Sequence, residues 1–433
     1  MLNFKMSLSL FTLVMAPLVF SKASAADAKL LTNSIEAKVI ELRRQLHQYP
    51  ELSNREIQTS KLVAKELRAL GLEVKTGVAH TGVVGILKGG KPGPLIALRA
   101  DMDALPVTEK VELPFASKVT AEYRGNKVGV MHACGHDTHV AMLLGVAHNL
   151  TKIKDQLAGD VMFIFQPAEE GAPEGEEGGA ELMLKEGLFT ARKPEKVFGL
   201  HVSSSMHTGT IALRSGPAMA SEDSFTIKVK GKQTHGSRPW QGVDPIVASA
   251  QVINSVQTII SRQVDVTKAP AVVSFGAING GVRSNIIPDE VELIGTIRTF
   301  DQAMRKDIKK RLGEIVTNAA ATLGATATTK IDDGYPVTVN NPELVAKMRP
   351  VLATVVDEGK LIEPSLITGA EDFSYYALET PGLFFFLGVT PPDQDLKNVA
   401  SNHSPHFYAD ESAFKIGVEA MTKLAMTELN VKN

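Results

Sequence analysis

The 433-residue chain contains one cysteine, Cys134, which has no partner for an internal disulfide. Neither sign of charge is in excess, since 46 basic residues stand against 48 acidic ones. This balance gives no indication of a nucleic-acid partner. Repeats and low-complexity tracts are also missing. A hydrophobic content of 44% is typical of a globular protein, and the length predicts two domains.

Long apolar runs are missing after the N-terminus. Lys5 precedes the apolar residues 6–20, and Ala23-Ser24-Ala25 fits the small-residue pattern of a signal-peptide cleavage site. An N-terminal membrane anchor is the alternative, but the run is short for a bilayer span. The sequence therefore predicts a signal peptide at residues 1–25 and an exported mature protein, periplasmic or secreted, without a membrane anchor.

The first part of the mature chain and its C-terminal part share the same pattern of predicted helices and strands. Helices and apolar strands alternate, which is typical of an α/β domain with a largely parallel sheet. The predicted helices are 34–48, 55–70, 138–150, 178–186, 342–357 and 410–429, and the predicted strands are 82–88, 94–99, 160–166, 196–201 and 383–389.

An inserted segment has a different order of elements. Its predicted elements are strand 223–230, helix 244–261, strands 271–277 and 289–299, helix 301–321 and strand 325–331. The order βαββαβ is that of a ferredoxin-like α+β unit. The sequence therefore predicts a larger domain at residues 26–216 and 333–433, interrupted by an inserted domain at residues 217–332.

Polar side chains stand at or just beyond the ends of three predicted strands: Asp101 and Asp103, then Glu169 and Glu170, then His201. Ligands of open α/β sheets bind at the carboxyl ends of strands, so these side chains are expected to share one crevice. Of two adjacent acids, one can ligate a metal while the other acts as general base, although a solvated loop explains the pair equally well. Asp101 either orients a metal ligand or belongs to a turn.

Cys134 lies in the segment GVMHACGHDTH, together with His132, His136 and His139. Thiolate, imidazole and carboxylate groups are ligands of zinc and related transition metals. The C-x-H spacing, without a second cysteine pair, argues against a closed structural zinc site. A nucleophilic thiol assisted by His136 or His139 is the alternative, but their spacing does not by itself give the required geometry.

Two further turns carry candidate histidines. His235 follows a strand of the inserted domain in a Gly/Ser/Pro-rich turn, where functional residues are common. His403 and His406 share a turn after the last apolar strand, and position alone does not choose between them.

Eight motifs, taken in order, resemble the amidohydrolase branch of the aminoacylase and carboxypeptidase metallopeptidase family. That branch includes hippurate hydrolases, N-acetyl-diaminopimelate deacetylases and hydrolases of auxin–amino acid conjugates. The resemblance covers nearly the whole mature chain and is specific for the family, though not for a substrate. The motifs are LRRQLHQYPELSNRE (42–56), LRADMDALPV (98–107), MHACGHDTHVAMLLGVA (131–147), FQPAEEGAPEGEEGGA (165–180), GLH (199–201), GKQTHGSRPW (231–240), NIIPDEVEL (285–293) and TGAEDFSYY (368–376).

The resemblance implies a catalytic domain of the di-metal aminopeptidase type, interrupted by a lid domain through which two chains form a homodimer. It also implies two divalent metal ions per subunit, of zinc, manganese, cobalt or nickel. The implied metal ligands are Cys134, His136, Glu170, His201 and His403. His403 is preferred over His406 because it is the first histidine of its motif.

The same resemblance makes Glu169 the general base and acid. His235 and Asn285 would hold the scissile carbonyl or the carboxylate of the substrate, with His235 reaching the site of the partner subunit. Arg99 departs from the wider family, which has a metal-binding histidine there, and the Cys134–His136 pair is expected to compensate. For His132 and His139 both a supporting role at the metal and a structural role stay open.

The predicted function is therefore a metal-dependent amidohydrolase that cleaves N-acyl amino acids, using Glu169 and a water molecule activated by the metal. A metallo-dipeptidase or carboxypeptidase acting on small peptides is the alternative. A cysteine-nucleophile hydrolase and a non-catalytic binding protein are two further classes that the sequence leaves open.

Overall fold

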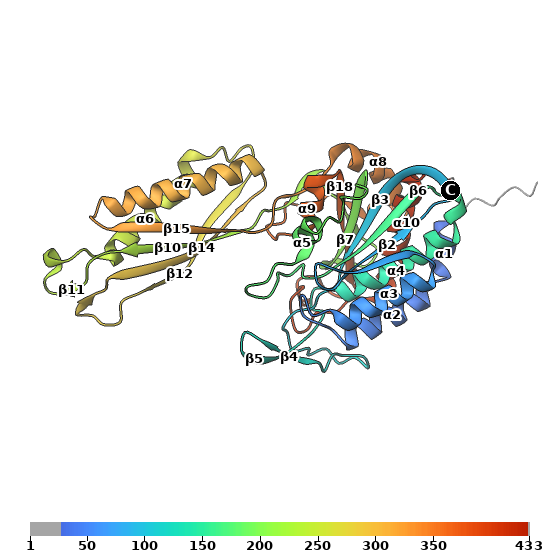
Figure 1. The fold of residues 1–433 in the computed structure, drawn as a ribbon, viewed down its shortest axis with the longest axis horizontal. Coiled ribbons are helices and arrows are strands. Elements are labelled where there is room, and N and C mark those ends of the chain that lie inside the picture. Colours follow the sequence, from blue (N-terminus) through green and yellow to red (C-terminus); the bar gives the residue numbers. More distant parts are fainter. Residues whose placement is uncertain (1–26, 432–433) are drawn as a thin grey trace, which may run out of the picture.

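The computed structural model describes residues 27–431. The predicted signal peptide at residues 1–25 lies outside the described residues. Among the described helices, none combines the length and apolar character needed to cross a bilayer. The larger domain and the inserted domain form two separate bodies, connected by two neighbouring chain segments (Figure 1).

An eight-stranded mixed sheet forms the centre of the larger domain. In spatial order its strands are β1 (Glu73–Val78), β2 (Gly82–Leu87), β6 (Ala158–Gln166), β3 (Lys91–Asp101), β7 (Lys196–His207), β18 (Gly382–Thr390), β8 (Ile211–Ala212) and β17 (Leu361–Ile362). The four strands β6, β3, β7 and β18 pair in parallel, so their carboxyl ends meet at one edge. Strand β18 is buried along its whole length, which explains its nearly continuous apolar sequence.

Helices cover both faces of this sheet. One face carries α1 (Ala28–Asn33), α2 (Glu36–Gln48), α3 (Ile57–Ala69), α4 (His136–Lys152), α8 (Pro342–Ala353) and α10 (Phe414–Glu428), and the opposite face carries α5 (Gly179–Lys185) and α9 (Phe373–Glu379). The predicted α/β architecture of the larger domain is confirmed.

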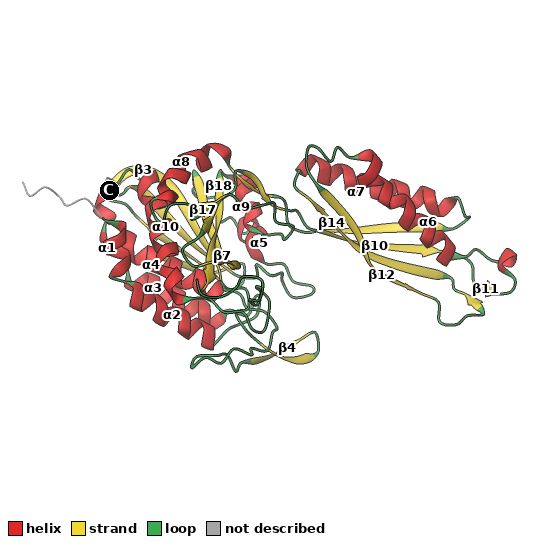
Figure 2. Cartoon of the chain, turned by 180° about the vertical axis from the view of Figure 1, so that it is seen from behind, coloured by secondary structure: helices red, strands yellow, loops and turns green. Residues whose placement is uncertain are grey.

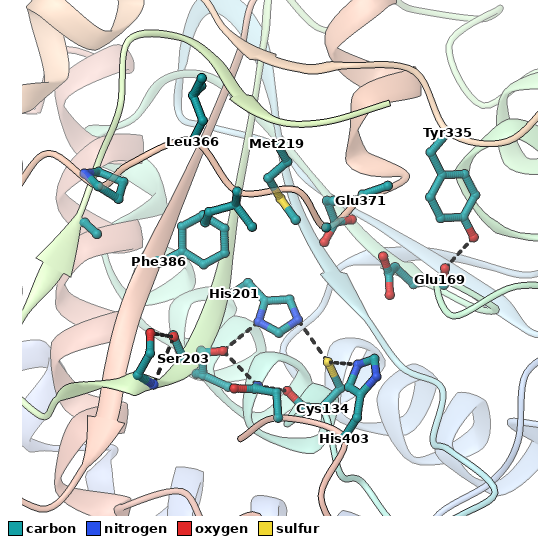
Figure 3. Close-up of a pocket in the computed structure, with 18 of the residues that line it drawn as sticks. Cys134, Glu169, His201, Ser203, Met219, Tyr335, Leu366, Glu371, Phe386 and His403 are labelled. Carbon is teal, nitrogen blue, oxygen red and sulfur yellow. Dashed lines mark hydrogen bonds between the residues drawn. The ribbon is translucent and has the colours of Figure 1, made fainter. Parts of the chain in front are cut away.

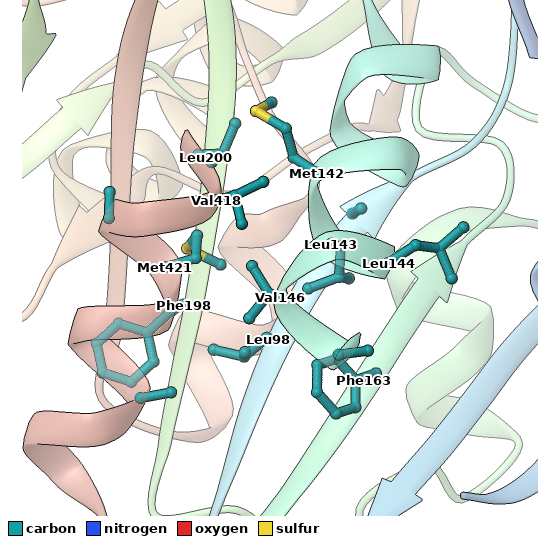
Figure 4. Close-up of a cluster of buried hydrophobic side chains, with 14 of the residues drawn as sticks. Leu98, Met142, Leu143, Leu144, Val146, Phe163, Phe198, Leu200, Val418 and Met421 are labelled. Carbon is teal, nitrogen blue, oxygen red and sulfur yellow. The ribbon is translucent and has the colours of Figure 1, made fainter. Parts of the chain in front are cut away.

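Helix α4 is apolar on nearly all sides and is packed between the sheet and α10, as expected of a helix in the middle of a core. Its side chains Leu143 and Val146 belong to one buried cluster with Leu98 and Phe163 of the sheet and Val418 of α10 (Figure 4). This packing fixes the start of α4, which follows Cys134 directly.

The inserted domain is a second layered unit with its own core. Its antiparallel sheet has the order β12 (Ala271–Gly280), β14 (Glu290–Thr299), β10 (Asp223–Lys230) and β15 (Thr326–Asp333), and α6 (Pro245–Thr258) and α7 (Gln302–Ala321) cover one face (Figure 2). With the order βαββαβ along the chain, this arrangement is ferredoxin-like, as predicted.

Short elements were not predicted from the sequence. Strand β1 is mostly exposed and therefore has no apolar signal, and two-residue strands carry no readable alternation. The other unpredicted pairs are β4 (Thr120–Tyr123) with β5 (Asn126–Gly129), β9 (Gly216–Met219) with β16 (Thr338–Asn340), and β11 (Thr234–His235) with β13 (Ile286–Ile287).

A buried ion pair stands where the chain enters the inserted domain. Asp223, the first residue of β10, is fully buried and accepts hydrogen bonds from Arg305 Nε at 2.8 Å and Arg305 Nη2 at 2.7 Å. Lys309 of the same helix, α7, reaches both Asp223 at 3.4 Å and the exposed Asp333 at 2.7 Å. The ion pair thus fastens α7 to the end of the sheet beside the two connecting segments.

Replacing Asp223 by Asn should lower the free energy of unfolding by about 3–5 kcal/mol, because the Arg305 guanidinium would stay buried without its carboxylate. The matched variant Asp333→Asn removes an exposed partner of the same helix and should cost less than about 1 kcal/mol. Urea unfolding followed by circular dichroism compares the two. Equal losses would contradict a special role for the buried pair.

Candidate metal centre and active site

The carboxyl ends of the parallel strands border a cavity of about 960 Å³. Glu169 and Glu170 line it just beyond β6, and His201 lines it from β7. Cys134 and His403 line the same cavity from segments that lie far away in the sequence. The expected crevice at the strand ends is therefore present, although Asp101 and Asp103 are buried behind it and do not line it.

A glycine turn sets the spacing between Cys134 and His136. Gly135 has a positive φ of 93°, and a Cβ atom there would lie 2.5 Å from Cγ2 of Val202. A residue with a side chain would be strained at this φ, and its Cβ atom would clash with Val202. The turn places His136 at the first position of α4, so that Cys134, which lines the cavity, and the buried His136 come from one short segment.

The five residues predicted as metal ligands lie together, and Figure 3 shows three of them, Cys134, His201 and His403. Cys134 Sγ lies 3.3 Å from His201 Nε2 and 3.2 Å from His403 Nε2. His403 Nε2 lies 3.1 Å from Glu170 Oε1, and His136 Nε2 lies 4.0 Å from the same oxygen. One sulfur, three imidazole nitrogens and a carboxylate thus converge from four different segments.

This donor set fits a divalent metal. His136 Nε2 is buried and has no hydrogen-bond partner among the described residues. Burial, together with the Glu170 and Glu169 carboxylates, raises the pKa of the Cys134 thiol well above its usual value. A thiolate at this position needs a neighbouring positive charge, which a bound cation provides.

Glu169 is buried next to these donors, with Oε2 3.8 Å from His136 Nε2. Burial raises the pKa of Glu169 well above its usual value, and the carboxylates of Glu371 and Glu170 raise it further. A raised pKa favours the protonated form of the carboxyl group. Glu169 therefore lies beside the donor cluster, where it can take up a proton.

Asp103 holds the base and a predicted ligand in one arrangement. Its Oδ1 lies 3.2 Å from His136 Nδ1 and accepts a hydrogen bond from Glu169 N at 3.1 Å, and its Oδ2 accepts one from Glu170 N at 3.0 Å. The hydroxyl of Ser53 donates to the same carboxylate at 2.8 Å. No separate role was predicted for Asp103, although it lies in the motif LRADMDALPV.

Asp101 supports the predicted metal ligands through His139 and not through a close contact of its own. It lies 3.8 Å from His136 but pairs with His139 Nδ1 at 2.5 Å. Nε2 of His139 in turn accepts a hydrogen bond from Val202 N at 2.9 Å, next to His201. His139 therefore supports the strand that carries a predicted ligand, while Asp103 is the closer partner of His136.

Arg99 is fully buried among acids. Its guanidinium lies 2.6 Å from Asp101 Oδ2, 2.9 Å from Glu371 Oε1 and 2.8 Å from Asp372 Oδ1. One cation does not balance three anions, and burial raises the pKa of Glu371 to about 8 and that of Asp372 to about 6. Arg99 thus places a fixed positive charge among these acids.

The loop with His403 is tied to the other ligand segments by Asn402. Its side-chain amide donates to Cys134 O at 3.1 Å and to Val202 O at 3.2 Å. His403 itself has a positive φ of 71°, a conformation that the surrounding contacts must hold in place. The structure therefore puts His403 at the cavity, whereas His406 is exposed and does not line it.

His132 has a different environment from its neighbours in the motif. It is buried, and neither ring nitrogen has a hydrogen-bond partner among the described residues. Burial lowers the pKa of His132 to about 4, so the ring is neutral at physiological pH. It does not line the cavity.

His235 and Asn285 are close to each other but not to the cavity. Gly236 N donates to Asn285 O at 2.8 Å, and β11, which carries His235, lies at the far end of the inserted domain (Figure 1). Neither residue lines the cavity of its own chain. Within one chain, the predicted substrate-holding residues and the donor cluster therefore do not meet.

Phe386 of β18, Met219 and Leu366 are among the apolar residues of the remaining cavity wall (Figure 3). Arg298 of β14 also lines the cavity, and its Nη2 lies 3.8 Å from Oε1 of Glu222, which lines the cavity as well. Further apolar side chains of the wall are those of Met206, Ile362 and Ile367. The sequence offered no signal for this wall, because its residues come from many separate segments.

A sulfur, nitrogen and oxygen donor set beside a buried proton carrier, at the strand ends of an α/β domain, defines a metal-dependent hydrolase. The family comparison agrees: the model described as Peptidase family M20/M25/M40 matches residues 97–427, and the chain belongs to this family. The resemblance seen in the motifs is confirmed, and the protein is a metal-dependent hydrolase of amide bonds.

Similar proteins align over most of their length. The chain is 45% identical to thermostable carboxypeptidase 1 of Saccharolobus solfataricus, over 90% of this chain and 95% of that one. It is 38% identical to N-acetyl-L-cysteine deacetylase of Bacillus subtilis, over 88% and 86%. The crystal structure of a Bacillus subtilis dinuclear metal binding peptidase of the M20 family superposes with a TM-score of 0.77 at 34% identity, covering 92% of this chain and 99% of that chain.

Replacing Asp103 by Asn should lower metal affinity or activity about 10–100-fold, because the ring of His136 would lose its anionic partner. The variant Ser53→Ala removes one hydrogen bond to the same carboxylate and should change either quantity by less than about threefold. Metal content after dialysis against graded chelator measures the affinity. Wild-type retention in Asp103→Asn would contradict this role.

Proposed function

We propose that this protein hydrolyses small N-acyl amino acids with two divalent metal ions per subunit. The observation that carries the proposal is the place of Glu169, a buried carboxyl group with a raised pKa beside the five-residue donor cluster. The cavity of about 960 Å³ is large enough for such a substrate.

The residues that would hold the ions are Cys134, His136, Glu170, His201 and His403. Zinc, manganese, cobalt and nickel all accept such a mixture of sulfur, nitrogen and oxygen donors. When bound, the ions polarise the scissile carbonyl and lower the pKa of a water molecule. A pair of ions is supported by the dinuclear metal binding relative of known structure.

Glu169 moves the proton of the reaction. Its carboxylate takes a proton from the attacking water and then gives it to the amine that leaves. The raised pKa favours the protonated state between these two transfers. The hydrogen bonds that Glu169 N and Glu170 N donate to Asp103 hold the turn that carries this carboxyl group.

The cavity offers matching chemistry for the two ends of the substrate. Arg298 supplies a cation for the carboxylate of the amino acid. The wall with Met219, Leu366 and Phe386 fits an apolar acyl group. Cleavage of small peptides is the second candidate, favoured by the similarity to a carboxypeptidase.

We also propose a homodimer formed through the inserted domain. Its edge strand β12 exposes Val272 at 43% and Ile278 at 55%, and Val282 beyond it is 94% exposed. An apolar edge strand of this kind readily pairs with another strand. Pairing would also allow His235 of one chain to reach the cavity of the partner and donate to the developing oxyanion.

We also propose that the protein is exported after cleavage of a signal peptide. This proposal is supported by the apolar run at residues 6–20 and the small residues Ala23-Ser24-Ala25. N-terminal sequencing of the protein isolated from its native host should begin at Ala26. A sequence that begins at Met1 would contradict cleavage.

The variant Glu169→Gln should keep its fold and metal but lower kcat on an N-acyl amino acid by about 10²–10⁴-fold, because an amide cannot carry the proton. The control Glu174→Gln changes an exposed acid of the same loop and should keep the wild-type kcat. Metal removal should abolish turnover and metal addition should restore it. Activity that survives metal removal would instead favour a cysteine nucleophile.

Mixed dimers test the exchange of His235 between subunits. Chains with Glu169→Gln and chains with His235→Ala should each be nearly inactive alone, because each lacks one group at every site. After unfolding and refolding together, random pairing should restore roughly a quarter of wild-type activity, from one complete site in each mixed dimer. No recovery, or a monomer in sedimentation analysis, would contradict the shared site.

A further inference from the structure

Tyr335 reaches the general base from the segment that connects the two domains. Its hydroxyl donates a hydrogen bond of 2.5 Å to the backbone carbonyl of Glu169 (Figure 3). Tyr335 lies between β15 and β16, and it lines the same cavity as Glu169. A residue of the connecting segment therefore contacts the turn that contains Glu169, the proposed general base.

This turn depends on side chains that hold its backbone. Ala168, just before the base, has a positive φ of 52°, which is uncommon for a residue with a Cβ and costs energy unless contacts maintain it. Glu56 accepts from Ala168 N at 2.9 Å, and Asp103 accepts from Glu169 N and Glu170 N. The carbonyl of Glu169 is held by Tyr335 alone among the described hydrogen bonds.

The backbone at Tyr335 follows the inserted domain. Arg305 of α7 donates through Nη2 to Gly334 O at 2.9 Å, and the same guanidinium is fixed by the buried Asp223. Glu222 N donates to Tyr335 O at 2.9 Å. The three hydrogen bonds to Glu56 and Asp103 thus fix the turn to the larger domain, whereas the fourth ties it to the base of the inserted domain.

The hydroxyl group of Tyr335 stays a donor over the working pH range. Burial, with the carboxylates of Asp372 and Glu169, raises the pKa of Tyr335 well above its usual value. Tyr375 gives a natural comparison, because its hydroxyl also contacts this connecting segment, at Gly334 O with 3.4 Å. Its ring packs edge-to-face against that of Tyr335, with centroids 6.3 Å apart.

We propose that Tyr335 is a positioning residue that makes the placement of the Glu169 carboxyl group depend on the position of the inserted domain. The inference rests on the role of Glu169 given under the proposed function. A movement of the inserted domain pulls or releases the hydrogen bond to Glu169 O, and the base turn, already in an unfavourable conformation, shifts with it. Small displacements of a catalytic group of this kind have large effects on rate.

The test compares Tyr335→Phe with Tyr375→Phe in the full-length, metal-loaded protein. Tyr335→Phe should lower kcat on the order of tenfold while KM changes less than about twofold, because substrate contacts stay intact and the proton carrier is displaced. Metal content should not change. Tyr375→Phe should keep kcat within about twofold, since it loses a contact to the segment but none to the base.

Hydrogen exchange supplies a readout that needs no turnover. In Tyr335→Phe the backbone amides of residues 168–170 should exchange faster than in wild type, and in Tyr375→Phe they should not. Unchanged kcat and exchange in Tyr335→Phe, or equal losses in both variants, would overturn the proposal. A wild-type protein that hydrolyses none of the N-acyl amino acids would refute the proposed function, while the exchange comparison would still decide whether Tyr335 holds the turn.

Discussion

The carboxylate of Asp103 is the interaction on which the active site depends. It is fully buried, and it receives hydrogen bonds from two consecutive backbone amides, a serine hydroxyl and a histidine ring. A buried anion is unfavourable unless its oxygens are all used, so these partners and the carboxylate fix one another. Because the two amides belong to Glu169 and Glu170, the same anion sets the directions of the base and of a metal ligand.

A second buried charge balances the region behind the site. Arg99 binds Asp101, Glu371 and Asp372 from the middle of the sheet. A guanidinium keeps its positive charge whether or not a metal is bound. It therefore helps to hold the buried acids in place, including Asp101, which pairs with His139.

The sequence predicted the parts of the site that follow directly from strand ends and motif order. Glu169, Glu170 and His201 follow long apolar strands, and Cys134 and His136 begin a long apolar helix, so their convergence could be expected. Asp103 was expected near the strand ends, but its hydrogen bonds to the amides of Glu169 and Glu170 were not. Asn402 and Tyr335 were missed because they donate to backbone carbonyls, in the case of Asn402 and Cys134 across 268 positions of sequence. Backbone partners leave no pattern of residue types that a sequence could reveal.

The inserted domain was also only partly predictable from the sequence. Its βαββαβ order could be recognised from apolar periodicity, because each strand and helix buries one face in a common core. Its position relative to the cavity could not, since that depends on a few polar contacts at Gly334 and Tyr335. His235 was expected in a turn of this domain and lies in the two-residue strand β11, directly before a turn. Its distance from the cavity of its own chain is visible only in the folded chain, where β11 lies at the far end of the inserted domain.

The separation of the two hydrophobic cores has a consequence for how the protein responds to a ligand. The buried core of the inserted domain is built from its own side chains, with Leu366 as a neighbour from the larger domain. A rotation of one body against the other would therefore leave both cores intact. A ligand that contacts both bodies could then favour one relative orientation without disrupting either core.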